Sequence, residues 1–173
     1  MLRKIFETTL NINRRAILGT FILCSPLTFA KSATNPINVQ AALIKNFTHL
    51  INWPTSHQWN SDNHFNLCVY DSSSVLKQFE TLFFDKVIKG KKARIIHVES
   101  TDLEGCDLTY LANTSAESVQ HLIESAQHKG VLIIGSNIGY GELGVHINFY
   151  EQGESIAFEL NKHTLDEAGF TVS

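Results

Sequence analysis

The stretch GVLIIGSNIGYGELGVHINFY, residues 130–150, decides the fold of this chain. Its apolar start predicts a buried strand, and Gly139, Gly141 and Gly144 follow in the spacing G-x-G-x-x-G. In a dinucleotide-binding fingerprint such glycines open a helix whose amides hold a pyrophosphate. Here the residues after Gly144 alternate between apolar and polar, which is the period of a strand, and Glu159, the candidate ribose-binding acid, lies within the next strand. We therefore expect the glycines to shape a loop, and we predict no cofactor.

Outward from this stretch, strands and helices alternate along the chain. Strands joined by helices predict an α/β fold with a largely parallel sheet and helices on both faces. The alternating runs after Gly144 add a C-terminal β-hairpin. The expected strands are residues 65–71, 93–99, 107–112, 130–136, 144–150 and 155–160, and the expected helices are residues 38–53, 73–84, 115–127 and a short one from Asn161.

Two helix ends can be predicted in detail. The first helix should end at Trp53, because the residue before a proline disfavours the helical region. The third should begin with a capping box, for which Thr114 and Glu117 are a better match than Ser115 and Ser118. The apolar stripe of the first helix is formed by Val39, Leu43, Phe47 and Leu50.

The N-terminal residues have the pattern of an export signal. Basic residues precede an apolar core that is too short to anchor the chain in a bilayer, and small residues follow. We predict a signal peptide over residues 1–30, cleaved after Ala30, which exports a single domain of residues 31–173 to the periplasm. Two alternatives are a twin-arginine signal at Arg14 and Arg15 and a retained membrane anchor. Lipidation at Cys24 is disfavoured because a leucine precedes that residue.

The charge of the exported part is negative. Residues 1–30 hold four of the 14 basic residues and one of the 17 acidic ones, so ten basic and sixteen acidic residues remain, a net charge of −6. Nucleic acids and anionic membranes are bound by clustered positive charge. We therefore expect neither as a partner.

Two cysteines remain after the signal peptide, Cys68 and Cys106. In an oxidising compartment an even pair most simply forms one disulfide. In the chain-entropy model a loop of this length contributes about 3–4 kcal/mol to stability. Two buried free thiols are the alternative, whereas a redox-active pair is disfavoured because the spacing is not C-x-x-C.

The chain offers little chemistry for catalysis. Its eight histidines do not form H-x-x-x-H or H-E-x-x-H, so their spacing predicts no metal site. There is no G-x-S-x-G nucleophile elbow, and no cysteine is left over to act as a nucleophile. We therefore expect a protein that is not an enzyme.

Two groups of residues are candidate contacts for a ligand or partner. Asp71, Ser136 and Asn137 follow predicted parallel strands, whose carboxyl ends commonly bind ligands. Residues 86–94 contain half of the basic residues of the exported part, and this segment is either a solvated turn or a contact for an acidic partner. Its candidate contacts are Lys89, Lys91 and Lys92.

The order and spacing of several segments resemble the YfiR family of periplasmic proteins. The clearest similarities are the aromatic-rich helix before Trp53-Pro54, the Gly105-Cys106 step, and Phe158-Glu159 ahead of Ala168-Gly169. The resemblance extends over nearly the whole predicted domain. The segments are NFTHLINWP (46–54), FNLCVYD (65–71), GCDLTYLA (105–112), VLIIGS (131–136), GVHINFY (144–150) and IAFELNKHTLDEAGFTVS (156–173).

The resemblance implies a non-catalytic α/β protein that represses a membrane-bound diguanylate cyclase through the periplasmic sensor domain of that enzyme. Such a protein lowers cyclic di-GMP and restrains biofilm formation, and a homodimer is possible. The bridge between Cys68 and Cys106 matches one of the cysteine pairs found in the family. The sequence departs from the family in lacking a second pair in the hairpin and an amphipathic helix after Ser173. A periplasmic small-ligand-binding module and an exported enzyme are the competing hypotheses.

Overall fold

The computed structural model describes residues 35–173. The predicted signal peptide, residues 1–30, and its cleavage site after Ala30 lie outside the described residues. Within the described part, no helix is both long enough and apolar enough to span a membrane.

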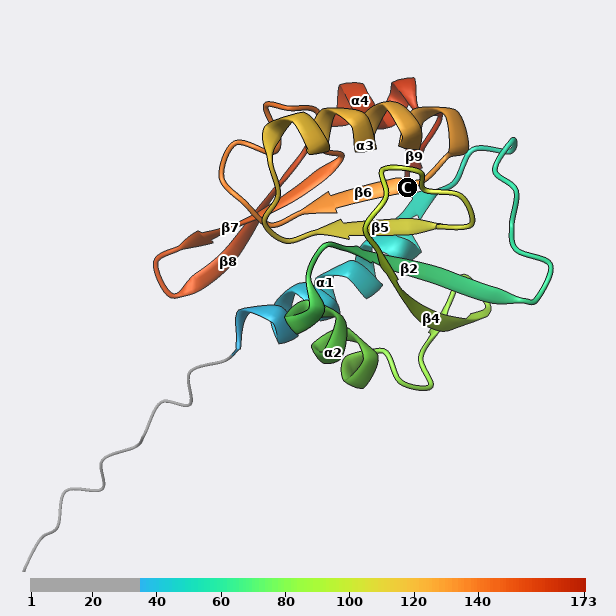
Figure 1. Ribbon diagram of the computed structural model, residues 1–173, viewed down its shortest axis with the longest axis horizontal. Helices are drawn as coiled ribbons and strands as arrows, with labels where there is room; N and C mark the ends of the chain where they lie inside the picture. The colour runs from blue at the N-terminus through green and yellow to red at the C-terminus, as the bar shows by residue number, and fades with distance from the viewer. Residues whose placement is uncertain (1–34) are drawn as a thin grey trace, which may run out of the picture. The chain divides into compact units, whose positions relative to one another are not determined.

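A seven-stranded sheet forms the centre of the fold, in the order β3-β4-β2-β5-β6-β7-β8 (Figure 1). Neighbouring strands from β4 to β7 run parallel, whereas β3 and β8 pair antiparallel at the two edges. The predicted α/β class, with its largely parallel sheet and C-terminal hairpin, is confirmed. The strands are β2 (His64–Tyr70), β3 (Val87–Ile88), β4 (Lys91–Val98), β5 (Leu108–Leu111), β6 (Leu132–Gly135), β7 (Ile147–Gln152) and β8 (Ser155–Leu160).

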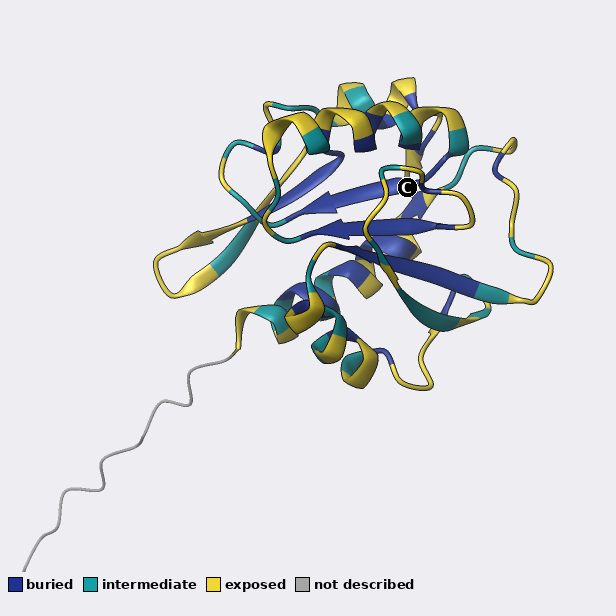
Figure 2. Cartoon of the chain, in the orientation of Figure 1, coloured by how far each residue is buried: buried dark blue, intermediate teal, exposed yellow. Residues whose placement is uncertain are grey.

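Helices cover both faces of the sheet, as predicted. Helices α1 (Pro36–Leu50) and α2 (Ser73–Leu82) pack on one face, and α3 (Ala116–Lys129) packs on the other. Alternate side chains of each central strand enter the two cores, so these strands are buried on both faces (Figure 2). In β2, for example, Leu67 belongs to the core under α1 and α2, and Cys68 to the core under α3.

A buried hydrogen bond fixes α1 to the middle of the sheet. The Tyr110 hydroxyl of β5 donates to Gln40 Oε1 of α1 at 2.5 Å. Burial raises the pKa of Tyr110 to about 12, so the phenol keeps its proton at physiological pH. This bond fixes the register of α1 against β5.

The predicted end of α1 at Trp53 is wrong. The helix ends at Leu50, and β1 (Ile51–Asn52) follows it and pairs antiparallel with β9 (Thr171–Val172). Pro54 restricts only the residue before it, whereas the earlier end is set by a strand partner about 120 residues away in sequence. The apolar stripe is also shifted, because Leu50 is 47% exposed. The face of α1 that is buried consists of Gln40, Ala41, Ile44, Phe47 and Thr48.

The predicted capping box of α3 is wrong as well. Ser115, not Thr114, is the N-cap, and its hydroxyl accepts the N–H of Ser118 at 3.1 Å. The backbone N–H and C=O of Thr114 are both bonded to the Tyr140 hydroxyl, which holds Thr114 outside the helix. Helix α2 likewise ends at Leu82, two residues before the predicted end.

The C-terminal elements follow the prediction closely. The β7–β8 hairpin turns through Gly153, whose φ of 63° lies in the region that favours glycine. Helix α4 (Lys162–Glu167) begins after Asn161, whose side chain accepts the N–H of Thr164 at 3.2 Å.

Candidate functional site

The predicted contact residues lie at opposite ends of the sheet. Asp71 and Ser136 follow β2 and β6, at the carboxyl edge, and β5 separates these two strands. Lys89 and Lys91 lie where β4 begins, at the amino edge. The structure therefore does not bring the candidates together in one site.

At the carboxyl edge, the polar groups of Ser136 and Asn137 bond within the protein. The Ser136 N–H donates to Leu111 O at 3.0 Å. The Asn137 side chain donates to Asn113 Oδ1 at 3.1 Å, and its carbonyl accepts from Asn148 Nδ2 at 2.9 Å. In the loop after β6, these polar groups therefore already have hydrogen-bond partners within the protein.

The glycines of residues 139–144 lie in turns that lead into β7, not into a helix. Gly141 allows the carboxylate of Glu159 to approach closely, because a Cβ at this position would lie 2.2 Å from Glu159 Oε1. Glu159 in turn accepts a hydrogen bond from Asn148 Nδ2 at 2.9 Å. The acid at the fingerprint distance therefore bonds across the hairpin, and its carboxylate lies beside Gly141.

The amino edge carries a surface that we call the tryptophan–lysine surface, made of Trp53, Trp59, Lys89 and Lys91. The two indole centroids are 5.8 Å apart. Lys89 Nζ lies 5.6 Å from the Trp53 ring, and Lys91 Nζ lies 5.6 Å from the Trp59 ring. Both distances are within the range of cation–π attraction. Partial burial lowers the pKa of the Lys89 ammonium.

Two other basic residues of residues 86–94, Lys92 and Arg94, are paired with acids. Lys92 Nζ lies 3.5 Å from Asp85 Oδ1, and Arg94 binds Asp62 at 2.5 Å and Asn66 Oδ1 at 2.8 Å. Within residues 35–173, the tryptophan–lysine surface has no ion pair of its own, so its two ammonium groups remain available to an acidic ligand.

A buried histidine–carboxylate pair lies beneath this surface and contacts both of its tryptophans. His57 Nε2 lies 2.8 Å from Asp107 Oδ1, and His57 Nδ1 lies 3.2 Å from the Lys129 carbonyl. Trp53 Nε1 donates to the Asp107 carbonyl at 3.1 Å, and the His57 ring meets Trp59 edge to face, with centroids 4.6 Å apart. Both ring nitrogens of His57 thus have a partner within the protein.

The disulfide lies beside the same surface. Cys68 of β2 and Cys106, just before β5, are bonded, with their Cα atoms 5.9 Å apart. Cys106, Trp59 and Gly105 line a hollow of about 600 Å³. The bridge thus ties the residues before β5, which line this hollow, to β2.

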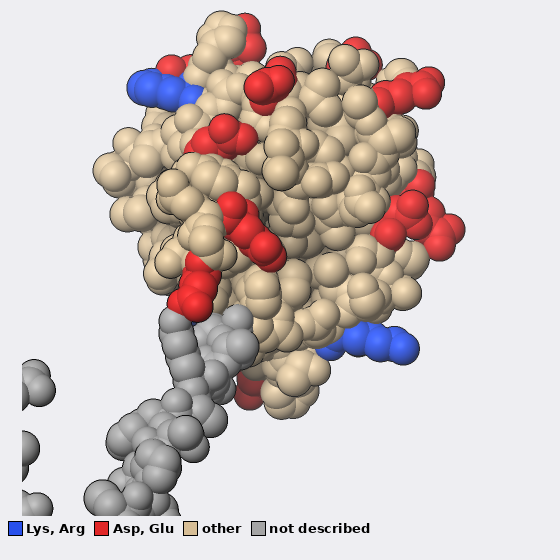
Figure 3. Space-filling model, turned by 90° about the vertical axis from the view of Figure 1, so that its left-hand side faces the viewer, with Lys and Arg blue, Asp and Glu red and all other residues tan. Residues whose placement is uncertain are grey.

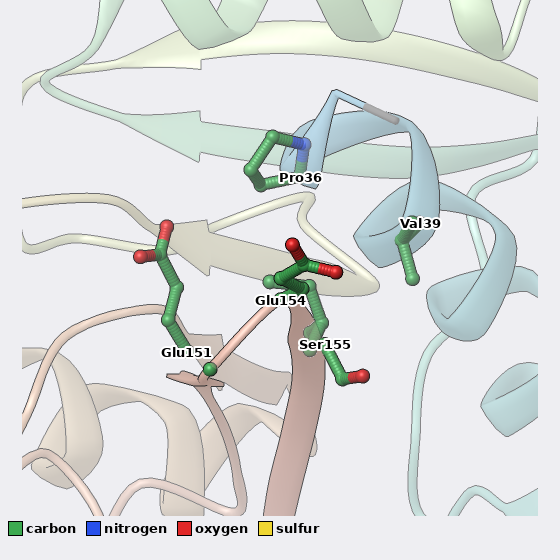
Figure 4. A pocket seen from close by; sticks show the side chains of 7 residues that line it. Pro36, Val39, Glu151, Glu154 and Ser155 are labelled. Carbon is green, nitrogen blue, oxygen red and sulfur yellow. The ribbon is translucent and has the colours of Figure 1, made fainter. Parts of the chain in front are cut away.

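A second hollow lies at the other end of the molecule, between the start of α1 and the hairpin tip (Figure 4). Its volume is about 450 Å³, and Val39 and Ile156 give it an apolar side. Glu151 and Glu154 line it from the hairpin. Figure 3 shows that carboxylates are spread over this side of the molecule, while basic side chains lie only near its margins.

Together these features show what kinds of site the described part of the chain offers. Within the described residues, no group of three His, Cys, Asp or Glu side chains could hold a metal ion. The buried pair of His57 and Asp107 links the loop after β1 to the sheet. The described residues present an aromatic and basic surface and two hollows to which a ligand or partner could bind.

The chain belongs to the YfiR/HmsC-like family, whose profile matches residues 37–173. This confirms the resemblance, and it places the protein in a family of periplasmic, non-catalytic regulators of cyclic di-GMP signalling. No curated protein matches the chain.

A similar fold occurs in a conserved domain protein from Vibrio cholerae O1 biovar eltor str. N16961. Its crystal structure matches with a TM-score of 0.54 and 15% identity. The match covers 82% of this chain and 58% of that protein. At this identity the likeness concerns the fold alone.

Sequence reasoning missed His57, Asp107 and Trp59. Their signal was the cluster WPTSHQW, which places a histidine between two tryptophans, together with the acid directly after Cys106. Only the fold shows that the cluster meets this acid, because His57 and Asp107 are 50 residues apart.

Proposed function

We propose that the protein is a periplasmic regulator that represses a membrane diguanylate cyclase by binding the periplasmic sensor domain of that enzyme. Repression lowers cyclic di-GMP and restrains biofilm formation. The observation that carries this proposal is the family match over residues 37–173, which includes nearly every described residue. The predicted signal peptide, residues 1–30, supports export to the compartment in which such a sensor domain lies.

The tryptophan–lysine surface is the contact that we propose for the sensor domain. Trp59 is 37% exposed and rests on the buried His57, so it offers a large and rigid apolar area. Tryptophan is over-represented among residues that dominate binding energy at interfaces. Lys89 and Lys91 flank the indoles and add attraction for a partner segment that carries Asp or Glu.

Binding to the cyclase encoded in the same genome tests this contact. The periplasmic segment of the cyclase is titrated with the wild-type protein and with a Lys89→Glu/Lys91→Glu variant. We expect the variant to bind at least about tenfold more weakly, because each reversal replaces attraction with repulsion. The matched control is Lys45→Glu/Lys77→Glu, which makes the same change of charge at exposed sites on α1 and α2. Equal losses in both variants would indicate an effect of net charge and exclude a specific contact.

A small-ligand-binding module is the second candidate. The hollow between α1 and the hairpin favours it, since Val39 and Ile156 offer apolar contact and Glu151 and Glu154 offer acceptors. Its ligand would be small, apolar on one side and cationic on the other. The binder hypothesis predicts that Ile156→Asp abolishes ligand binding and leaves cyclase binding unchanged.

A further inference from the structure

The hollow beside Trp59 has the size of a small-molecule site and mainly polar walls. Its volume is about 600 Å³, within the range of roughly 300–1,000 Å³ that is usual for ligand pockets. Three segments that are far apart in sequence line it: residues 56–61 after β1, residues 103–106 before β5, and His128 with Lys129 at the end of α3. The fold thus brings together a cavity that no single sequence motif predicts.

Bonds between these segments fix the walls of the hollow. Asn60 Nδ2 donates to the Gly105 carbonyl at 3.2 Å, which joins the first segment to the second. His57 Nδ1 lies 3.2 Å from the Lys129 carbonyl, which joins the first segment to the third. The disulfide at Cys106 ties the second segment to β2. A ligand that enters this hollow therefore meets walls that are already ordered, and ordering costs of this kind otherwise reduce affinity.

Several polar side chains at the hollow have no partner in the protein. Within residues 35–173, the side chains of Ser56, Gln58, Ser61 and Glu104 make no hydrogen bond or ion pair, and all four residues are exposed. The carboxylate of Glu104 only accepts hydrogen bonds, whereas the amide of Gln58 and the two hydroxyls both accept and donate. This set of groups suits a ligand that is rich in hydroxyls.

Trp59 adds a large apolar surface to the polar hollow. Although Lys91 Nζ lies 5.6 Å from its ring, Trp59 is 37% exposed, and an edge-to-face contact with the buried His57 holds the indole in place. The C–H groups on the face of a pyranose ring carry partial positive charge and are attracted to the negative face of an aromatic ring. Stacking on an indole and hydrogen bonding of hydroxyls are the two contacts that a sugar ring makes.

The charges at the hollow favour a neutral ligand. Lys129 pairs with Asp102, and the His128 ring is bonded through Nδ1 to the Glu124 carbonyl at 2.8 Å. Glu104 therefore contributes an isolated carboxylate, which attracts neither phosphate nor acidic ligands. A carboxylate is also a strong acceptor for hydroxyl donors, because hydrogen bonds to charged groups are stronger than neutral ones.

We propose that this hollow binds a neutral saccharide, with one pyranose ring stacked on Trp59 and its hydroxyls bonded to Glu104 and Gln58. Glucose-configured rings fit best, because their equatorial substituents leave the ring faces apolar. The site goes beyond the proposed function: it requires no cyclase, although it shares Trp59 with the tryptophan–lysine surface. It also differs from the hollow at the hairpin, whose acidic residues suit a cationic ligand.

Titration of the exported protein with disaccharides, followed by nuclear magnetic resonance, tests the site. The probes are cellobiose and N,N′-diacetylchitobiose, which have glucose-configured rings and differ in their acetamido groups. We expect saturable shifts at millimolar concentration in the Trp59 indole signal and in the backbone amides of Gln58 and Gly105, and none at Gly153 in the hairpin hollow. A response to either probe supports the site: cellobiose alone would indicate glucans, and diacetylchitobiose alone would indicate amino-sugar glycans.

Sorbitol is the matched control ligand. It carries similar hydroxyls on an open chain and has no ring face to stack, so it should produce no saturable shift. Saturable binding of sorbitol equal to that of the disaccharides would overturn the stacking on Trp59 and with it the proposal. The absence of saturable shifts with both disaccharides would overturn the proposal as well.

Substitutions assign the two kinds of contact. Trp59→Ala should weaken binding at least about tenfold, whereas Trp59→Phe should retain most of it, because a phenyl ring also stacks. Glu104→Gln should weaken binding about fivefold, because neutral bonds replace charge-assisted ones. Glu117→Gln, at an exposed site at the other end of α3, is the matched control and should bind like the wild type. Glu104 is exposed, so Glu104→Gln retains the fold. Wild-type affinity in both Trp59→Ala and Glu104→Gln would contradict the site.

Discussion

His57 Nε2 lies 2.8 Å from a carboxylate oxygen of Asp107, and both side chains are almost fully buried. The other carboxylate oxygen accepts the backbone N–H of Asn66 at 2.6 Å. The pair thereby joins the loop after β1 to the starts of β2 and β5. The pair also contacts both tryptophans, since Asp107 accepts a hydrogen bond from one and His57 packs against the other.

Removal of either member of this pair should strongly destabilise the protein. Asp107→Ala should lower the free energy of unfolding by about 3–5 kcal/mol, because it leaves the buried imidazole without its carboxylate. Asp102→Ala is the matched control, since the Asp102 carboxylate pairs with Lys129 at the surface, where water screens the attraction, and its loss should have little effect. Urea denaturation measures both values. Equal effects of the two substitutions would contradict the role of the buried pair.

Substitution of the two tryptophans should have different effects, one on stability and the other on binding. Trp53 packs edge to face on Phe65 and Phe170, so Trp53→Ala should cost about 3–5 kcal/mol of stability. Trp59 is more exposed, and Trp59→Ala should leave the melting temperature nearly unchanged while weakening binding to the sensor domain. Thermal melts and a binding titration distinguish these roles. An unchanged melting temperature for Trp53→Ala would make Trp53 a contact residue instead.

Acid should weaken the fold through His146. The side chain is fully buried, Nδ1 accepts the Ile133 N–H at 3.0 Å, and burial lowers the pKa of the imidazole to about 4. Between pH about 6.5 and about 4 the unfolded chain binds a proton that the folded chain does not. The stability present at neutral pH should therefore fall by about 3 kcal/mol across this window and then level off.

Unfolding in urea at pH 7 and at pH 4.5 checks this dependence. The fall in stability should be smaller in His146→Gln, which cannot take up the proton. His163→Gln, a change at the surface, should keep the wild-type dependence. If His146→Gln loses as much stability as the wild type, other groups cause the acid sensitivity.

The disulfide should contribute measurable stability in the exported protein. Cys68→Ser should lower the free energy of unfolding by about 2–5 kcal/mol, because the bridge closes a loop between residues 38 apart in sequence. Peptide mapping without reductant should recover Cys68 joined to Cys106. Recovery of two alkylated thiols from the native exported protein would show that the disulfide does not form.

Local sequence patterns predicted most of the sheet but not its long-range partners. The alternation of Val145, Ile147 and Phe149 identified β7, and it excluded a dinucleotide loop, because strand period is a local property. The end of α1 at Leu50 was missed because it depends on the pairing of Ile51 with Val172, far away in sequence. The start of α3 was misplaced because the Tyr140 hydroxyl occupies the backbone of Thr114.

The candidate site was also predicted only in part, because its residues are far apart in sequence and meet only in the fold. Lys89 and Lys91 were identified by their local charge, but their tryptophan neighbours lie more than 30 residues away in sequence. Asp71, Ser136 and Asn137 were grouped by a general rule about strand ends. That rule does not state which strands are neighbours, and β5 lies between the strands concerned.

The central claim is that the protein represses a cyclase from outside the cytoplasm, and the most direct test is cyclic di-GMP in a deletion strain. Deletion should raise cyclic di-GMP, and the full-length protein should restore the wild-type level. A version without residues 1–30 should not restore it, although it is produced in equal amount. Deletion should have no effect in a strain that also lacks the partner cyclase. Rescue by the version without residues 1–30, or an unchanged level after deletion, would contradict the account.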